Sequence, residues 1–116
     1  MPELFEAFTS IDRVIHEPAR LSILSALDEC RQADFLFLQS LTALSKGNLS
    51  QHLSKLEDAG LVEIQKVFNK MSHTTVRLTP EGRTAIRAYW RDLQRTRRNV
   101  SRWGLRFRQA ATSHEM

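Results

Sequence analysis

The sequence contains one cysteine, few glycines and prolines, and no long run of apolar residues. Cys30 cannot form a disulfide within the chain, which argues against a small secreted protein stabilised by disulfides. We expect this cysteine to be a small buried hydrophobic residue. No apolar run approaches the roughly 20 residues that span a bilayer, and the acidic start MPELFEAF is unlike a secretory signal. We therefore expect a cytoplasmic protein that does not bind membranes.

The residue patterns of catalytic and metal sites are also missing. The sequence has no glycine-rich phosphate loop and no cluster of carboxylates with a companion base. Ser50 and His52 are two positions apart in an expected helix, so their side chains point to different sides. The histidines, His16, His52, His73 and His114, lack the spacing of metal ligands. We expect no enzymatic activity, no cofactor and no metal site.

Charge is distributed unevenly along the chain. Residues 1–60 carry 5 Lys and Arg against 9 Asp and Glu, whereas residues 61–116 carry 12 against 4. A basic surface of this kind favours a polyanionic partner, nucleic acid first. The alternative is that the acidic part neutralises the basic part within the protein itself.

Apolar spacing predicts an amphipathic arm over residues 1–16, followed by three helices. Pro18 suits the first turn of the first helix. Asp34 is a candidate N-cap for the next segment, FLFLQSLTAL. This segment is apolar enough to be a strand, but the spacing of Leu38 and Leu41 favours a helix. Its shortness suits the first helix of a helix-turn-helix.

The third helix, in SKGNLSQHLSKLEDAG, has two chemically different faces. With about 100° between successive residues, Leu49, Leu53 and Leu56 share a narrow arc, and polar residues occupy the opposite one. Ser45 is a candidate N-cap, and Gly60 suits the position just after the helix. Such a helix can pack through its leucines and enter a DNA major groove with its polar face. The alternative is an ordinary solvated face.

The apolar period changes from 3.6 to 2 after this helix. LVEIQKVF and TTVRL are rich in β-branched residues and bracket NKMSH, which predicts a β-hairpin. Thr79, as a cap, and Pro80 then begin a long helix over residues 80–113. Its apolar residues follow a heptad-like seam with Arg97 and Gly104 as weak points, and the end of the helix around Gly104 is left open. A second subunit, the N-terminal arm or both must cover this seam.

The arginines of the last helix allow two interpretations. Residues 77–108 contain ten arginines and only Glu81 and Asp92 as acids. One interpretation is a helix that binds polyanions or membranes. The other is a dimerisation helix whose arginines meet the acidic arm of a second subunit. The spacing of aromatic residues such as Trp90 and Phe107 favours seam packing, and so dimerisation.

Several segments in combination resemble a known family. IHEPARLSILSAL, DFLFLQ, SKGNLSQHLSKLEDAGLVEIQK and RLTPEGR are similar to small winged helix-turn-helix transcriptional regulators related to the MarR and ArsR groups. The resemblance covers residues 11–90 and implies a homodimeric prokaryotic DNA-binding regulator. By position, the recognition helix is at about 46–59 and the wing at about 66–75. The wing FNKMSH has fewer cations than relatives often have, and the paired cysteines of metal-sensing ArsR-like proteins are missing.

We therefore predict a single domain, mainly α with a β-hairpin wing (α+β): a winged helix-turn-helix. The arm spans residues 1–16, the winged helix core 17–79 and the C-terminal dimerisation helix 80–113. Double-stranded DNA and a second copy of the chain are the expected partners, a repressor is the expected role, and a small-molecule effector is left open. The alternative is a winged-helix protein–protein interaction module without specific DNA binding. The expected DNA-binding residues are Ser45, Lys46, Asn48, Ser50, Gln51, Ser54, Lys55, Asn69, Lys70 and His73. The expected dimer interface comprises Phe5, Phe8, Ile86, Trp90, Leu93, Val100, Trp103 and Phe107.

Overall fold

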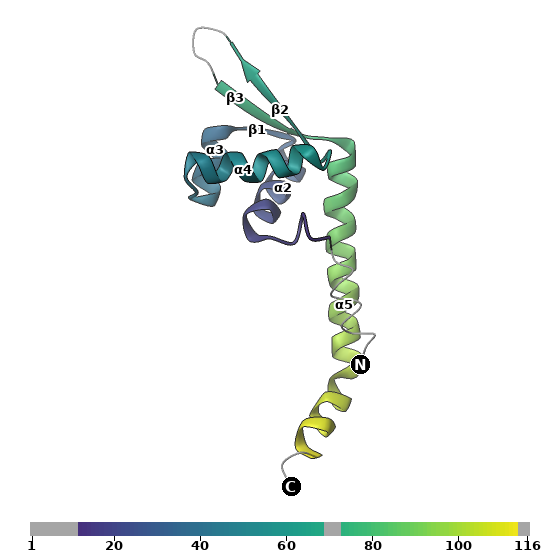
Figure 1. Ribbon diagram of the computed structural model, residues 1–116. Helices are drawn as coiled ribbons and strands as arrows, with labels where there is room; N and C mark the ends of the chain where they lie inside the picture. The colour runs from purple at the N-terminus through teal and green to yellow at the C-terminus, as the bar shows by residue number, and fades with distance from the viewer. Residues whose placement is uncertain (1–11, 69–72, 114–116) are drawn as a thin grey trace. The chain divides into compact units, whose positions relative to one another are not determined.

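The computed structural model describes residues 12–68 and 73–113, which contain four helices and three strands (Figure 1). The elements in chain order are α2 Pro18–Cys30, β1 Gln32–Asp34, α3 Phe35–Thr42, α4 Lys46–Asp58, β2 Val62–Val67, β3 His73–Leu78 and α5 Pro80–Ser113. The predicted order of helices followed by a β-hairpin and a long helix is confirmed, and so is the α+β winged helix fold. The structure divides into two compact units, Asp12–Ala88 and, from Tyr89 onward, the rest of α5.

The sheet has one strand more than the sequence predicted. The strand order is β1-β3-β2, and all pairs are antiparallel. In β2 and β3, Ile64 lies opposite Val76, and Val76 also lies opposite Ala33 of β1. For residues 32–34 the sequence predicts only an N-cap at Asp34. This strand is only three residues long, so its sequence carries no alternating pattern, and its pairing with β3 alone defines it.

The core lies between the helices and one face of the sheet. α4 contributes Leu49, Leu53 and Leu56, which are at most 2% exposed, as its predicted leucine arc requires. Burial of a side chain of this size stabilises the fold by about 1.5–3 kcal/mol. The remaining fully buried side chains are Ile15, Ile23, Leu24, Leu27, Leu38, Val62, Val76 and Ile86.

The caps predicted for the helices are present at the expected residues. Ser45 Oγ accepts a hydrogen bond from the backbone N–H of Asn48, 3.2 Å away, at the start of α4. Asp34 is the N-cap of α3, but its side chain makes no capping hydrogen bond to the described backbone. Gly60 follows α4 with φ +77°, a left-handed conformation that glycine adopts without strain.

Two expectations for buried and exposed residues require correction. Cys30 is exposed, because it is the last residue of α2 and lies beyond the part of that helix that packs in the core. Ile86, expected in the dimer interface, is fully buried within the unit of residues 12–88. Its side chain therefore belongs to the protomer's own core and presents no surface to a second copy.

The first turn of α5 is tightly joined to the end of α4. The Thr79 hydroxyl donates to the Gly60 carbonyl (2.7 Å) and accepts from the Gly82 N–H (2.8 Å), which confirms Thr79 as the cap. A Cβ at Gly82 would lie 2.1 Å from the Leu61 carbonyl oxygen, so only glycine fits there. α5 continues through Gly104 as far as Ser113, the last residue that the structure describes.

Candidate nucleic-acid interface

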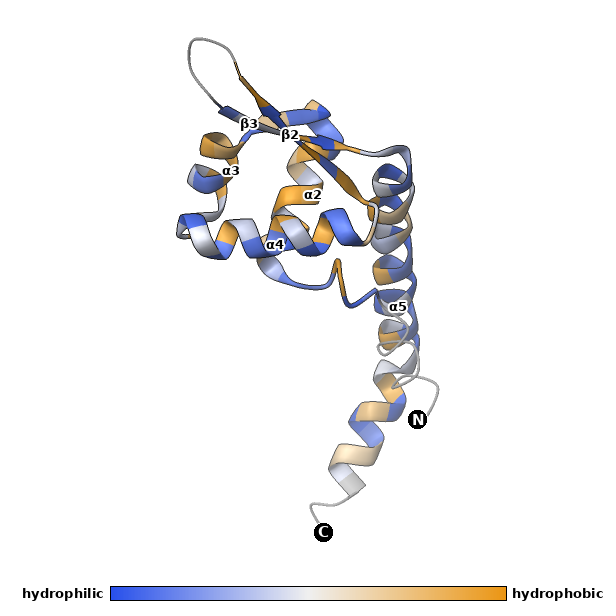
Figure 2. Cartoon of the chain, turned by 45° about the horizontal axis from the view of Figure 1, so that its top comes forward, coloured by the Kyte–Doolittle hydropathy of each residue, from blue (hydrophilic) through white to orange (hydrophobic). Residues whose placement is uncertain are grey.

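The outer face of α4 carries the predicted DNA-binding residues. Figure 2 shows hydrophobic and hydrophilic residues alternating along this helix. The hydrophobic ones are the buried leucines described above. The exposed residues at its N-cap and along its outer face are Ser45, Lys46, Asn48, Ser50, Gln51, Ser54 and Lys55. They combine donors and acceptors that can bond to base edges with lysines that can bond to guanine or phosphate.

The N-terminal end of α4 lies beside the hairpin. Lys46 and Ser50 line a hollow of about 470 Å³ together with Lys66 of β2 and His73 of β3. Predicted residues from the helix and from the wing therefore lie on one surface. Its positive charge is partly offset by Asp34, which lines the same hollow. The predicted wing residues at positions 69 and 70, Asn69 and Lys70, lie outside the described residues.

The C-terminal end of α4 has a second basic group, which the sequence analysis missed. Lys55 lines a hollow of about 390 Å³ with Arg13 and Arg20, and Asp58 is the only acid among the described residues there. The Arg20 side chain donates hydrogen bonds to the carbonyls of Val14 and Arg13, which orders the segment that carries Arg13. Arg13 precedes Lys55 by about forty residues in an acidic half of the chain, so no local pattern identified it.

His52 faces α2 and not the outer surface of α4. Its Nδ1 lies 3.1 Å from Arg20 Nη1 and 3.6 Å from Glu17 Oε2. Glu17 is the N-cap of α2 and accepts a 2.8 Å hydrogen bond from the backbone N–H of Arg20. Burial alone would raise the pKa of Glu17, but hydrogen bonds from the Arg20 and Ala19 N–H groups and the nearby His52 and Arg20 outweigh it, so this pKa is lowered. His52 thus positions α4 on α2.

The part of α5 beyond Ala88 has an incompletely covered apolar side. Trp90 is 44% exposed, and a hollow of about 480 Å³ runs along the helix beside Trp90, Leu93 and Val100. Nearer the C-terminus, the rings of Trp103 and Phe107 stack with centroids 6.4 Å apart. These five residues belong to the expected dimer interface. Phe5 and Phe8, also expected there, lie outside the described residues.

Other kinds of site find no support in the described part of the chain. Within residues 12–68 and 73–113, no group of three or more acidic, histidine or cysteine side chains is placed to hold a metal ion. No helix in these ranges has the length and apolarity that a bilayer crossing requires.

Comparison with known proteins agrees with this geometry. A family model described as a winged helix DNA-binding domain matches residues 19–96. An uncharacterized protein from Methanocaldococcus jannaschii is 30% identical over 89 residues, which cover 76% of this chain and 97% of that protein. The family match spans α2 to α5, and so includes both the hairpin and the polar face of α4.

Solved structures of transcriptional regulators share the fold. A transcriptional regulator homologue from Pyrococcus horikoshii is 31% identical, with a TM-score of 0.76 over 86% of this chain and 98% of that one. A MarR-family regulator from Silicibacter pomeroyi is 20% identical, with a TM-score of 0.59 over 99% of this chain and 77% of that one. The predicted resemblance to winged helix regulators of the MarR group is confirmed at the level of the fold.

Proposed function

Because the chain belongs to the winged helix DNA-binding domain family, we propose that it is a transcriptional repressor that binds a palindromic DNA site as a homodimer. α4 is the recognition helix and enters the major groove. The hairpin, at about residues 66–75, contacts the flanking backbone. Two copies place their recognition helices in successive major grooves, about 34–36 Å apart.

The observation that carries this proposal is the division of α4 into two faces. Its leucines are at most 2% exposed, whereas every residue on its outer face is exposed. Asn48 and Gln51 offer amides that can bond to two positions of an adenine at once, and Ser50 and Ser54 are short enough to let the helix approach the bases. The carboxylate of Glu57, at the C-terminal end of the helix, accepts a hydrogen bond from the Ile64 N–H (3.2 Å) and so is directed toward β2.

Basic residues at both ends of α4 support contacts to the DNA backbone. Lys46 and Lys66 lie at one end, and Arg13 and Lys55 at the other. Phosphate contacts on either side of the groove fix the register of a recognition helix without reading sequence. We include Arg13 in the proposed interface for this reason.

The homodimer is supported by the apolar side of α5 from Trp90 onward. Half-exposed aromatic side chains of this size are the usual anchors of protein interfaces. We place Trp90, Leu93, Val100, Trp103 and Phe107 in the interface, and leave Ile86 out because it is buried in the protomer.

A titration with duplex DNA tests the proposal. Fragments from upstream of the protein's own gene are followed by fluorescence anisotropy at several salt concentrations, with random duplex as competitor. We expect tight binding to one fragment that persists against competitor, with a log–log salt slope of about −0.9 per phosphate contact. Equal weak binding to all duplexes that disappears near physiological salt would contradict sequence-specific recognition.

The rival function, a protein interaction module, is favoured by one observation. Leu36, Phe37 and Leu41 on α3 are 45–69% exposed, which is unusual for large apolar residues so close together. If the titration shows no specific duplex, α3 and α5 become the surfaces to test for a protein partner.

A further inference from the structure

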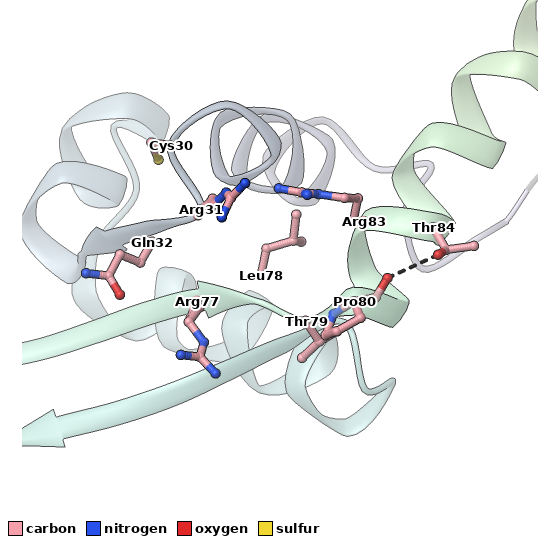
Figure 3. Close-up of a pocket in the computed structure, with 9 residues that line it drawn as sticks. All are labelled: Cys30, Arg31, Gln32, Arg77, Leu78, Thr79, Pro80, Arg83 and Thr84. Carbon is pink, nitrogen blue, oxygen red and sulfur yellow. Dashed lines mark hydrogen bonds between the residues drawn. The ribbon is translucent and has the colours of Figure 1, made fainter.

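A second charged cavity lies apart from the proposed DNA interface. It has a volume of about 780 Å³ and is formed by the C-terminal end of α2, the start of β1, the end of β3 and the first turns of α5 (Figure 3). All of its lining residues lie within the unit of residues 12–88. None of the residues that line it is among those proposed to contact DNA. The lining residues are Cys30, Arg31, Gln32, Arg77, Leu78, Thr79, Pro80, Arg83 and Thr84.

The cavity has an excess of positive charge. In Figure 3 the side chains of Arg31, the residue that follows α2, and Arg83 of α5 extend toward one another, whereas Arg77 lines the cavity from β3 with its guanidinium directed away from them. No acidic side chain of the described residues lines the cavity. Like charges that face each other across a cavity repel, so an anion between them would be stabilised.

Nearby acidic residues neutralise the positive charge of these arginines only in part. Oδ1 of Asp28 is 3.5 Å from Nε of Arg83 and also 3.5 Å from Nε of Arg87, so one carboxylate serves two guanidinium groups. Arg77 pairs with Glu63 at 3.5 Å, but both side chains are more than half exposed, and such pairs are weak. Arg31 has no ion-pair partner among residues 12–68 and 73–113, so its charge is available to a ligand.

Arg31 also holds an unfavourable backbone conformation. Its φ of 70° and ψ of −40° lie on the left-handed side, where an L-residue with a side chain is strained by roughly 1–2 kcal/mol. Its N–H donates to the Leu27 carbonyl (2.8 Å) and its carbonyl accepts from the Leu78 N–H (2.9 Å). Glycine would make both backbone bonds with less strain. Strain at a charged residue that lines a cavity points to a use for its side chain.

We infer that this cavity binds the phosphate group of a small molecule. Guanidinium groups bond to phosphate oxygens through two parallel N–H donors, and two of them that face one another from different segments can hold a phosphate between them. Leu78 and Pro80 provide apolar surface for the rest of the ligand, and the volume is typical of small-molecule sites. The hydroxyls of Thr79 and Thr84 already donate to backbone carbonyls, so the arginines and Gln32 are the available donors.

Inorganic phosphate is the probe for a first test. The full chain is titrated with phosphate at constant ionic strength and followed by ¹H–¹⁵N NMR. We expect saturable shifts at residue 31 and residues 77–84, and weaker binding of acetate. Arg31→Gly should lower phosphate affinity at least about 10-fold, as expected for the loss of a charged hydrogen-bond donor. The same substitution should leave the melting temperature unchanged or raised, because glycine relieves the strained φ.

Arg98→Gln is the matched control, because it removes one positive charge from an exposed position of α5 that does not line the cavity. It should leave phosphate affinity unchanged. An absence of saturable shifts, or an equal loss of affinity in Arg98→Gln and Arg31→Gly, would overturn the inference. If Arg31→Gly weakened binding to duplex DNA as strongly as it weakened phosphate binding, the cavity would be a DNA contact and the small-molecule site would be wrong.

Discussion

α4 and the outer part of α5 are both amphipathic helices, but the chain covers their apolar sides to very different extents. In α4, Leu49, Leu53 and Leu56 are almost completely buried by α2, α3 and β2. In α5, Ile86 is equally buried, whereas Trp90, one turn further on, is 44% exposed. The four-residue step from Ile86 to Trp90 fits the helical spacing of the seam and does not mark this boundary.

This difference separates two kinds of apolar side chain that look alike in sequence. Residues up to Ile86 stabilise the protomer, because the core of residues 12–88 reaches them. Of the apolar residues from Trp90 onward, Trp90 itself is 44% exposed, and in the proposed dimer these residues would gain most from the partner. The polar face of α4 stays exposed because its leucine face already holds the helix in place, as the proposed DNA binding requires.

The largest effect is expected at the buried side of α4. Leu53→Ala should lower the free energy of unfolding by about 2–5 kcal/mol, through lost burial and a residual cavity. Urea unfolding followed by circular dichroism measures this change. Ser54→Ala, on the exposed face of the same helix, should change it by no more than about 0.5 kcal/mol. Equal effects of the two substitutions would show that the faces of α4 are not distinct.

Substitutions in the exposed part of α5 should weaken dimerisation and leave folding unchanged. Trp90→Ala should raise the dimer dissociation constant at least about 30-fold, as for an interface anchor worth 2 kcal/mol or more. Sedimentation equilibrium measures the constant. Leu105→Ala is the control, since Leu105 is 60% exposed but lies off the seam. If both variants dimerise like the wild type, α5 is not the interface.

Recognition through α4 predicts a loss that depends on DNA sequence. Gln51→Ala should reduce affinity for the specific fragment by roughly 1–3 kcal/mol, the value of one bidentate base contact. Its affinity for random duplex should stay the same in the anisotropy titration. Gln109→Ala, an exposed amide near the end of α5, should change neither value. A uniform loss on all duplexes would assign Gln51 to the backbone and not to a base.

Arg13 should behave as a phosphate contact. Arg13→Gln should weaken binding to specific and random duplexes alike and reduce the magnitude of the log–log salt slope by about 0.9. Arg108→Gln makes the same change in net charge at an exposed position of α5 and should leave the slope unchanged. An unchanged slope in Arg13→Gln would remove this residue from the interface.

The smallest effect concerns the helix on which α4 packs. Glu17 has a lowered pKa, so its carboxylate stabilises the fold above the ordinary carboxyl pKa, and this contribution is lost as pH falls through the folded-state pKa. Glu17→Gln should therefore lower stability at pH 7 by about 0.3–1 kcal/mol, as for a charge at a helix N-terminus. Thermal unfolding should show the two proteins converging below about pH 4. A gap that stays constant with pH would exclude the charge as its cause.

The features that the sequence predicted well are those that depend on the local spacing of residues. The faces of α4, its cap at Ser45, the hairpin and the start of α5 at Pro80 each depend on residues a few positions apart. The exposed polar residues of α4 followed directly from these faces.

The features that were missed depend on contacts between distant segments. β1 exists because it pairs with residues 75–77 of β3. Arg13 reaches Lys55 because Arg20 holds the segment before α2 against the end of α4. The spacing of apolar residues along α5 likewise does not show where the protomer's own core ends. The sequence therefore predicts both Ile86 and Trp90 in the dimer interface.

The junction at Thr79 has a consequence for substitutions at residues that lie outside the proposed DNA interface. Its hydroxyl joins the Gly60 carbonyl to the Gly82 N–H, and Gly82 lies directly against the Leu61 backbone. The first turn of α5 therefore cannot rotate without moving the end of α4. Thr79 and Gly82 are not among the proposed DNA-binding residues. Substitutions there should nonetheless weaken binding to the specific DNA fragment in the proposed function, because they shift the end of the helix that carries those residues.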